Sequence, residues 1–383
     1  MAARDRAVQR LEGLLDEQDF SWSLCLVGED QSQKFAQLAG ELREPFSRTG
    51  DGKRISSGFS YWGVESTMAW IHACSDLFYP VMRESIESFT RRWARLAAHL
   101  DGRPFHYVSL GTGTGHKDHT VLSRLGRDNP GLCYLPVDVS PEMLRLSRRE
   151  ALRGLDIPVG NVVPVQLDFS SARNMAGLRG LVERLVGDEP VVYSLLGNTL
   201  ANFPDDTALL DSLTSHLLRR QDRFLLEVAS TDRLDHDSAA AAAREYRGSP
   251  RFGEFVTSAV MQYTDLHIDM DSVSFDAAVE DDRALLVKVV YRNRTGEQLR
   301  LTLPDRSSVE FPPDDTIRLL LTRKYLPSGL EKTLADAGVS EVDRATSGFT
   351  AGYGAPRFGM ELVLLQSEAT PAPGPVPPPN PFA

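Results

Sequence analysis

The chain has 383 residues, of which 42% are hydrophobic, so it can bury one large core or two ordinary ones. Its 42 Lys and Arg against 53 Asp and Glu give a net charge of -11, which disfavours binding to nucleic acids and to acidic membrane surfaces. The three cysteines form neither a disulfide framework nor a CxxC metal clamp, and the N-terminus lacks the apolar core of a secretion signal, so we expect a cytoplasmic protein that does not span a membrane.

The first hundred residues are predicted to be mainly helical. Apolar residues recur at helical spacing in three sets, which are Val8, Leu11, Leu14 and Leu15, then Phe35, Leu38 and Leu42, then Ile86, Phe89, Trp93, Leu96 and Leu100. A Gly- and Ser-rich break over residues 49–67 carries Phe59, Tyr61 and Trp62, aromatic residues that a plain linker would not need. We expect this break to fold over another part of the molecule.

From residue 106 the sequence alternates between short apolar runs and amphipathic segments. The runs are HYVSL, LCYLPVD, NVVPVQLD, PVVYSLLG and RFLLEVAS, and residues 141–153, 172–186 and 207–219 have helical patterns between them. Continuous apolar runs are typical of strands that are buried on both faces of a parallel sheet. The sequence therefore predicts an α/β fold with a doubly wound, mostly parallel sheet.

After residue 229 an alanine-rich segment, SAAAAAREY, precedes closely spaced candidate strands. These are LHIDM, VSFDAAVED, ALLVKVVYRN, QLRLTL and TIRLLLTRKY, for which we expect antiparallel hairpins with RNRTGEQ as one turn. A helix over residues 328–338 and the runs VSEVDRAT and FGMELVLLQ would return the chain to the main sheet. The expected parts are an N-terminal helical portion of a substrate domain (1–85), a Rossmann-like domain (86–238), a β-rich insertion of the substrate domain (239–325), a return to the Rossmann-like domain (326–366) and a disordered Pro-rich tail (367–383).

The candidate ligand-binding residues follow three of the predicted strands. The stretch SLGTGTGHK places Gly111, Gly113 and Gly115 where a backbone can turn tightly and let a ligand approach its N–H groups. Asp138 ends the next strand, where a carboxylate can accept two ribose hydroxyls, and Asp168 with Phe169 ends the third, suited to an adenine ring. The ordered set predicts that one adenosine is bound across the carboxyl edge of the sheet.

Two cofactors fit an adenosine site, a nicotinamide dinucleotide and S-adenosylmethionine. The dinucleotide fingerprint is G-x-G-x-x-G, whereas this chain has G-x-G-x-G, and Lys117 stands where a cation can bind the α-carboxylate of a methionine tail. The sequence therefore favours S-adenosylmethionine. His116 and His119 are spaced to share a helical face, but no cluster of Cys, His or Glu completes a ligand set, so we expect no metal.

The motifs LGTGTGHK, PVDVS, QLDF and LLGNTLANF together resemble those of the histidine Nα-methyltransferases of ergothioneine biosynthesis, and RKYLPSGLEKTLADAGV resembles a later segment of that family. The resemblance implies a Rossmann-like S-adenosylmethionine domain and a second, smaller domain, made of N-terminal helices and the inserted β-rich segment, that closes over an amino acid. It implies cofactor binding by Gly111, Thr112, Gly113, Lys117, Asp138, Asp168 and Phe169. It further implies substrate binding by Gly197, Asn198, Asn202, Tyr246 and Thr322, and Tyr61 is added as a substrate-binding candidate because its loop could cover the pocket.

The family's glutamate that helps to hold the imidazole ring corresponds to Leu320 in this sequence, so the resemblance leaves the identity of the substrate open. We expect an N-methyltransferase that acts on the amino group of an amino acid or a similar small metabolite. The amine must reach the methyl group as the neutral base, and Tyr61, Tyr246 and Glu227 are the catalytic candidates for managing its proton. An NAD(P)-dependent oxidoreductase and a non-catalytic S-adenosylmethionine-binding partner protein remain as alternatives.

Overall fold

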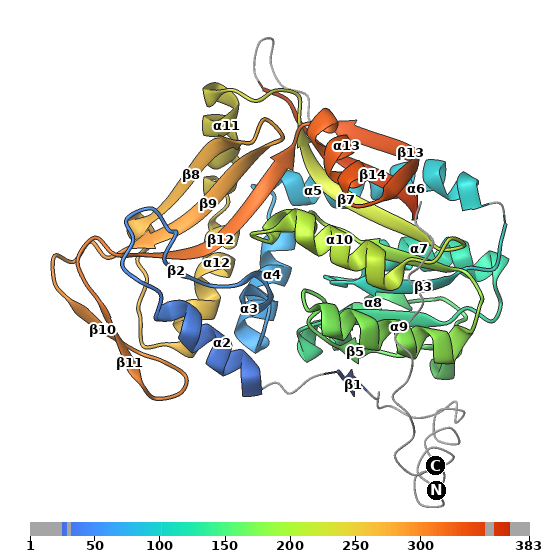
Figure 1. Ribbon diagram of the computed structural model, residues 1–383, viewed down its shortest axis with the longest axis horizontal. Coiled ribbons are helices and arrows are strands. Elements are labelled where there is room, and N and C mark those ends of the chain that lie inside the picture. The colour runs from blue at the N-terminus through green and yellow to red at the C-terminus, as the bar shows by residue number, and fades with distance from the viewer. Residues whose placement is uncertain (1–24, 29–31, 101, 349–355, 368–383) are drawn as a thin grey trace, which may run out of the picture.

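The computed structural model describes residues 25–28, 32–100, 102–348 and 356–367. One sheet of 12 strands runs through the molecule, and its central order is β5-β4-β3-β6-β7-β14-β13 (Figure 1). The strands from β5 to β7 are parallel, whereas β14 runs antiparallel to β7 and β13 antiparallel to β14. These strands are β3 (His106–Leu110), β4 (Tyr134–Asp138), β5 (Val165–Gln166), β6 (Val191–Leu195), β7 (Arg223–Thr231), β13 (Val339–Gly348) and β14 (Phe358–Ser367). This is the doubly wound Rossmann-like sheet that the sequence predicts.

Helices cover both faces of this sheet because each central strand is apolar on both sides. Along β6, Tyr193 contributes to one core and Val192 to the other, as the alternation of side chains in a strand requires. One face is covered by α9 (Ala172–Val186), α10 (Asp206–Leu217) and α13 (Pro327–Asp336), and the other by α6 (Phe89–Leu96), the 3-10 turn Ala97–Leu100 and α7 (His116–Asp128).

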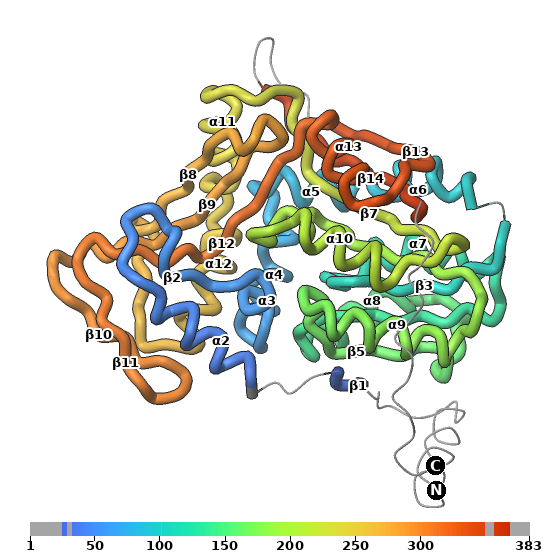
Figure 2. The backbone as a smooth tube through the Cα atoms, in the orientation of Figure 1, coloured from blue at the N-terminus to red at the C-terminus, as the bar shows by residue number. Residues whose placement is uncertain are grey.

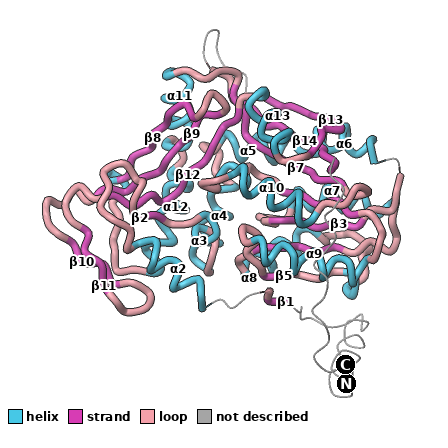
Figure 3. The backbone as a smooth tube through the Cα atoms, in the orientation of Figure 1, coloured by secondary structure: helices cyan, strands magenta, loops and turns pink. Residues whose placement is uncertain are grey.

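A second group of elements is built on the strands β8 (Val273–Glu280), β9 (Ala284–Arg292) and β12 (Thr316–Tyr325), which pair antiparallel. They share one hydrophobic core with α2 (Ser32–Leu42), α3 (Ser57–Ser60), α4 (Val64–Cys74), α5 (Pro80–Glu87), α11 (His236–Arg247) and α12 (Pro250–Tyr263). Figure 3 shows the strands continuing from this group into the main sheet, and the junction is the pairing of Tyr325 on β12 with Ser230 on β7. The N-terminal and inserted segments therefore fold together.

Two further features complete this group. The short strand β2 (Lys53–Arg54) runs parallel to β12 (Figure 2), and there Lys53 pairs with the buried Asp315 at 2.7 Å. The strands β10 (Leu299–Thr302) and β11 (Ser308–Phe311) form a separate hairpin. The remaining elements are β1 (Leu26–Val27), α8 (Pro141–Ala151) and the 3-10 turns Val159–Asn161, Leu200–Asn202 and Met270–Ser272.

Several expectations about individual elements need correction. LHIDM is not a strand: Leu266 and Ile268 are buried alternately, but no described strand pairs with them, so the alternation reflects burial alone. The turn RNRTGEQ does not join a hairpin, since β9 pairs with β8 and β12 while β10 pairs with β11. The helix α12 was not expected. The apolar residues expected on one helical face over residues 86–100 instead lie on three elements, α5, α6 and a 3-10 turn, and α5 and α6 meet at Ser88.

The expected helix near Leu11 and almost all of the Pro-rich tail lie outside the described residues, and the proposed domain boundaries stay predictions. Within the part of the chain that the structure describes, no helix is both long enough and apolar enough to cross a membrane.

Candidate active site

The larger of two adjoining cavities lies at the carboxyl ends of β3, β4, β5 and β6. It encloses about 950 Å³ of empty space, part of it open to solvent. It is lined by Ser57, Gly58, Tyr61, Trp70, Cys74, Met82, Ile86, Gly111, Thr112, Gly113, Thr114, Gly115, Lys117, Asp118, Asp138, Val139, Met143, Leu167, Asp168, Phe169, Leu196, Gly197, Thr199 and Phe203. All seven residues that the resemblance implies for the cofactor are in this lining.

The glycine turn after β3 forms one wall of the larger cavity. Gly111, Gly113 and Gly115 all have positive φ angles, which other residues adopt only with strain. A Cβ atom on Gly115 would lie 2.3 Å from the carbonyl oxygen of Ser147, so the turn can pack against α8 only with glycine there. The buried hydroxyl of Thr112 has no hydrogen-bond partner among the described residues, as expected of a group that meets a ligand.

Asp138 is the last residue of β4 and is buried in the lining of the larger cavity. Its Oδ1 accepts a hydrogen bond from the backbone N–H of Ser140 at 2.9 Å, and the backbone N–H groups of Thr112 and Val139 also face it. Burial raises the pKa of Asp138 to about 7 although these donors favour the charged form. The carboxyl group is thus placed to accept ribose hydroxyls but is only partly ionised near neutral pH.

Asp168 lies just beyond β5 and is paired with Lys34, which comes from α2. Its other carboxylate oxygen accepts hydrogen bonds from the backbone N–H of Ser170 at 2.9 Å and from its hydroxyl at 2.6 Å. Burial opposes ionisation, but Lys34 and Ser170 outweigh it and hold the pKa of Asp168 below its ordinary value. Sequence reasoning missed Lys34 because no local pattern links two residues that are 134 positions apart.

Glu227 does not line either cavity, which corrects the expectation that it is a catalytic group. It is 0% exposed on β7, and its carboxylate pairs with Lys117 and, at 2.7 Å, with Nη2 of Arg92. It also accepts hydrogen bonds from Ser85 Oγ at 3.0 Å and from the backbone N–H of Gly197 at 2.7 Å. Burial raises its pKa, but Lys117 and Arg92 outweigh this and keep the pKa below its ordinary value. Glu227 therefore holds Lys117 and Gly197 in place and has no capacity left for a substrate proton.

The smaller cavity adjoins the larger one and shares Tyr61, Trp70 and Gly197 with it. It has about 260 Å³ of empty space and is also lined by Tyr79, Asn198, Asn202, Tyr246, Phe252, Leu320 and Thr322. All six residues proposed from the sequence for the substrate lie in this lining, although they come from α11, β12 and the loops that follow α3 and β6. Trp70, Tyr79 and Phe252 were not predicted, because aromatic residues at helical spacing are typical of a hydrophobic core.

Tyr61 and Tyr246, the two tyrosines of the smaller cavity that the sequence predicts as catalytic groups, are neutral phenols. Tyr61 accepts a hydrogen bond from Nδ2 of Asn202 at 3.3 Å, whereas the Tyr246 hydroxyl, in a side chain that is 1% exposed, has no hydrogen-bond partner among the described residues. Burial raises the pKa of both side chains above the ordinary value for tyrosine. Both hydroxyls can therefore donate hydrogen bonds to a ligand but are poor proton acceptors at neutral pH, which narrows the catalytic role expected of them.

Asn198 lines the smaller cavity, but its side-chain amide is fully engaged within the protein. Its Oδ1 accepts from the Ala229 N–H at 2.8 Å, and its Nδ2 donates to Thr322 Oγ1 at 3.0 Å and to the Arg323 carbonyl at 3.1 Å. Asn202, by contrast, is not a helix cap, since Asp205 caps α10 through the Ala208 N–H. The Asn202 amide lines the smaller cavity, where its Nδ2 already donates to Tyr61.

The two histidines near the glycine turn are engaged elsewhere. His116 lies 2.9 Å from Glu150, and Nδ1 of His119 lies 3.2 Å from the carbonyl oxygen of Ala151. Among the residues described, no three His, Cys, Asp or Glu side chains gather as metal ligands do.

Comparison of the sequence with models of protein families identifies one matching family. The model for histidine-specific, S-adenosylmethionine-dependent methyltransferases matches residues 60–348, well over half of the chain. A comparison with curated proteins gave no match.

Similar solved structures include an S-adenosylmethionine-dependent methyltransferase from Clostridium acetobutylicum ATCC 824, which is 14% identical, with 74% of this chain and 92% of that chain covered and a TM-score of 0.37. They also include the magnesium protoporphyrin IX methyltransferase of Synechocystis PCC 6803 with bound S-adenosylhomocysteine, at 12% identity, 79% and 95% coverage and a TM-score of 0.37. A third is the 1,6-didemethyltoxoflavin-N1-methyltransferase of Burkholderia thailandensis, at 14% identity, 79% and 88% coverage and a TM-score of 0.36.

Proposed function

The chain belongs to the histidine-specific, S-adenosylmethionine-dependent methyltransferase family, and on this basis we propose that it methylates the amino group of an amino acid or a similar small metabolite. The observation that carries the proposal is the meeting of the two cavities at Tyr61, Trp70 and Gly197. A donor in the larger cavity and an acceptor in the smaller one would face each other there.

The residues of the larger cavity suit S-adenosylmethionine. We assign Asp138 to the ribose hydroxyls, Asp168 and Phe169 to the adenine ring, and the turn from Gly111 to Gly113, with the unpartnered Thr112 hydroxyl, to the methionine end. Burial lowers the pKa of Lys117, but its pairing with Glu227 opposes this and favours the ammonium form. The cluster of Lys117, Arg92 and Glu227 has two positive charges and one negative charge. Its net charge of about +1, beside Gly197, complements the α-carboxylate of the cofactor.

Methyl transfer needs a neutral amine in line with the sulfonium. When bound, S-adenosylmethionine supplies an electrophilic methyl group: the amine lone pair forms the N–C bond while the electrons of the C–S bond return to sulfur. Among the described residues no acidic side chain lines the smaller cavity, so burial there disfavours the ammonium form and promotes loss of its proton to water. Tyr61, Tyr246 and Asn202 would orient the substrate as hydrogen-bonding groups.

We further propose that the protein works in the cytoplasm, which agrees with its three free thiols at Cys25, Cys74 and Cys133.

Calorimetry followed by a methylation screen tests the proposal. We expect S-adenosylmethionine and S-adenosylhomocysteine to bind and NAD(P) not to bind, and we expect labelled methyl groups to appear on the amino nitrogen of at least one of the twenty amino acids, detected by mass spectrometry. Binding of dinucleotide without the sulfonium compounds would instead favour an oxidoreductase. Cofactor binding without methylation of any amine would favour a non-catalytic binding protein.

A further inference from the structure

We propose that the substrate carries an uncharged, apolar side chain, with an aromatic ring the best match, and that Leu320 selects it. This inference rests on the proposed amino-group methylation and names the class of amino acid involved. Its basis is the wall of the smaller cavity, which contains the side chains of Trp70, Tyr79, Tyr246 and Phe252 together with Leu320, all of them buried.

The smaller cavity offers no partner for a charged side chain. Of its ten lining residues none is Asp, Glu, Lys, Arg or His, a statement that covers the described part of the chain. A cationic or anionic side chain placed there would lose its water without gaining an opposite charge, which opposes its binding. Charged amino acids should therefore be excluded by desolvation alone.

The polar groups of the cavity are too few to hold both an amino-acid backbone and an imidazole. The Asn198 amide is already used by Ala229, Thr322 and Arg323. This leaves the Asn202 amide and the Tyr61, Tyr79, Tyr246 and Thr322 hydroxyls, all of them uncharged, which the carboxylate and the amine of the substrate would need. An imidazole carries two ring nitrogens that both require hydrogen-bond partners when buried, whereas an apolar side chain requires none.

Aromatic contacts in the wall favour a ring over an aliphatic chain. Trp70 packs against Tyr61 with ring centroids 5.2 Å apart and nearly perpendicular planes, and Tyr79 lies 5.0 Å from Phe252. Both spacings fall in the range in which aromatic rings attract one another through edge-to-face or tilted packing. A substrate ring in the cavity, placed against these lining side chains, would make the same kind of contact.

Leu320 is the specificity-determining position because of its place on β12. The register of β12 with β9 pairs Leu320 with Val289 and Thr322 with Val287, so Leu320 and Thr322 project from the same face of the strand into the cavity. Leu320 is 6% exposed and belongs to the core shared with α11 and α12. A carboxylate at this position would be the only charged group in the described lining of the smaller cavity.

The wild-type protein provides the first test. All twenty amino acids at equal concentration would be offered with S-adenosylmethionine, and each amino acid would be titrated separately by calorimetry in saturating S-adenosylhomocysteine, so that binding is read without turnover. We expect tryptophan or phenylalanine to be methylated at least about tenfold more efficiently than histidine, lysine or glutamate, with the same order in binding. Preference for histidine or a charged amino acid would overturn this inference but leave the proposed function intact, whereas no methylation of any amino acid would count against both.

Three variants at one position provide the second test. Leu320→Glu should weaken binding of the apolar amino acid at least about tenfold and raise the relative affinity for histidine. Leu320→Gln has the same length without the charge and should show the first effect but not the second, while Leu320→Met conserves volume and should keep the wild-type preference. S-adenosylhomocysteine affinity reports whether each variant is folded, and an unchanged substrate order in a folded Leu320→Glu protein would refute the role of Leu320.

Discussion

Asp138 is a carboxyl group whose charge depends on how deeply it is buried. Three backbone N–H groups stabilise its anion, yet removal from water dominates and brings its pKa to about 7 in the ligand-free protein. Ribose hydroxyls are better held by a carboxylate than by a carboxylic acid, because a charged acceptor makes the stronger hydrogen bond. Proton binding and cofactor binding should therefore compete at this residue.

We predict that the affinity for S-adenosylhomocysteine depends on pH through Asp138. Above pH 7 the carboxylate is already charged, and the affinity for S-adenosylhomocysteine is at its highest. Below pH 7 the ligand-free protein must release a proton from Asp138 before it binds, so the affinity falls by at most tenfold per pH unit. The Asp138→Asn variant should bind S-adenosylhomocysteine more weakly by about 1.5 to 3 kcal/mol at high pH, and its affinity should no longer depend on pH. Calorimetry between pH 5.5 and 8.5 measures both effects, and an identical pH profile in the variant would assign the proton to another group.

The sequence identified the cavity residues that stand at strand ends and in the glycine turn, but not the side chains that hold them. Gly111, Asp138 and Asp168 could be predicted because strand ends and glycine turns are local patterns that a parallel sheet brings to one edge. The partner of Asp168, Lys34, and the partner of Glu227, Arg92, could not, since each pair joins residues more than a hundred positions apart. For that reason Glu227 was expected in the site, whereas it lies beneath it.

The loop between β6 and α10 shows how one residue links several elements. Asn198 has a φ angle of 66°, a left-handed conformation that asparagine adopts more readily than most residues. In this conformation its amide bridges the backbone N–H of Ala229 on β7 and the carbonyl of Arg323 on β12. The loop that carries Gly197 and Asn202 is thereby fixed to both parts of the sheet.

We predict that Asn198→Ala is less stable than Asn198→Gly. Both substitutions leave the buried N–H of Ala229 without its acceptor, at a cost of about 1 to 3 kcal/mol. Alanine in addition keeps the left-handed conformation at a further cost of about 1 kcal/mol, which glycine avoids. Urea denaturation of the two variants gives the difference, and equal stability would mean that the loop relaxes to a negative φ angle.

At the scale of elements, the parallel sheet could be predicted better than the antiparallel part. Each parallel strand is a continuous apolar run followed by an amphipathic helix, and α9 has the bounds predicted for it, Ala172–Val186. Antiparallel strands are recognised by alternation, which does not tell which strand pairs with which. That is why the expected turn after β9 was wrong and why β12, rather than β10, lies beside β9.

For the molecule as a whole, the contact between the two parts depends on a buried network of charges around Arg323. This side chain is 2% exposed and pairs with Glu280 at 2.6 Å, while Asp206 accepts from Tyr325 Oη at 2.6 Å and pairs with Arg283 at 2.8 Å. Burial disfavours the charge of Asp206, but the neighbouring arginines and Tyr325 outweigh it and lower its pKa. The charges thus compensate one another where β8, β12 and α10 meet.

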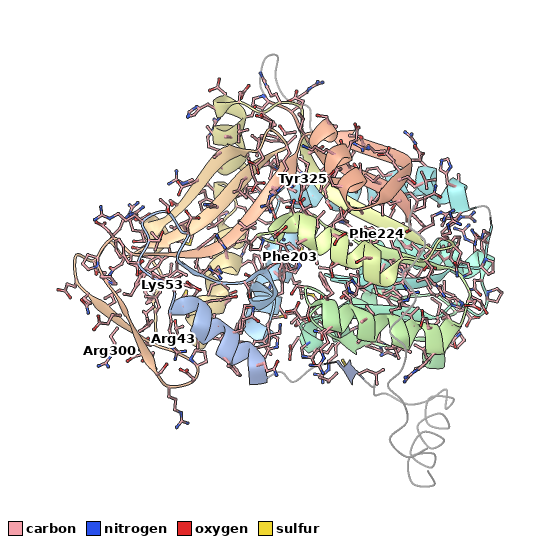
Figure 4. The ribbon with its side chains drawn as sticks, viewed as in Figure 1. Arg43, Lys53, Phe203, Phe224, Arg300 and Tyr325 are labelled. Atoms are coloured by element: carbon pink, nitrogen blue, oxygen red, sulfur yellow. The ribbon has the colours of Figure 1, made fainter. Side chains whose placement is uncertain are left out.

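The network also reaches the candidate site. Arg323 donates hydrogen bonds to the carbonyl oxygens of Ala201, Phe203 and Pro204, which flank Asn202 in the smaller cavity. Phe203 and Tyr325 both lie where the two parts of the molecule meet (Figure 4). Phe203 also lines the larger cavity, but none of these carbonyl groups belongs to the glycine turn after β3, so Arg323 should affect the position of the substrate more than that of the cofactor.

We therefore predict that Arg323→Met separates the two binding events. Loss of the buried pair should lower the free energy of unfolding by on the order of 3 kcal/mol, since Glu280 and three carbonyl oxygens lose their donor. The KM of the methylated amino acid should rise several-fold while the affinity for S-adenosylhomocysteine changes little. Arg43→Met is the matched control (Arg43 is labelled in Figure 4): its pair with Asp305 at 2.6 Å is well exposed to solvent, and its loss should cost no more than about 1 kcal/mol and leave the KM unchanged. Equal weakening of cofactor and substrate in Arg323→Met would mean that the network supports the fold as a whole and does not act on the loop of Asn202.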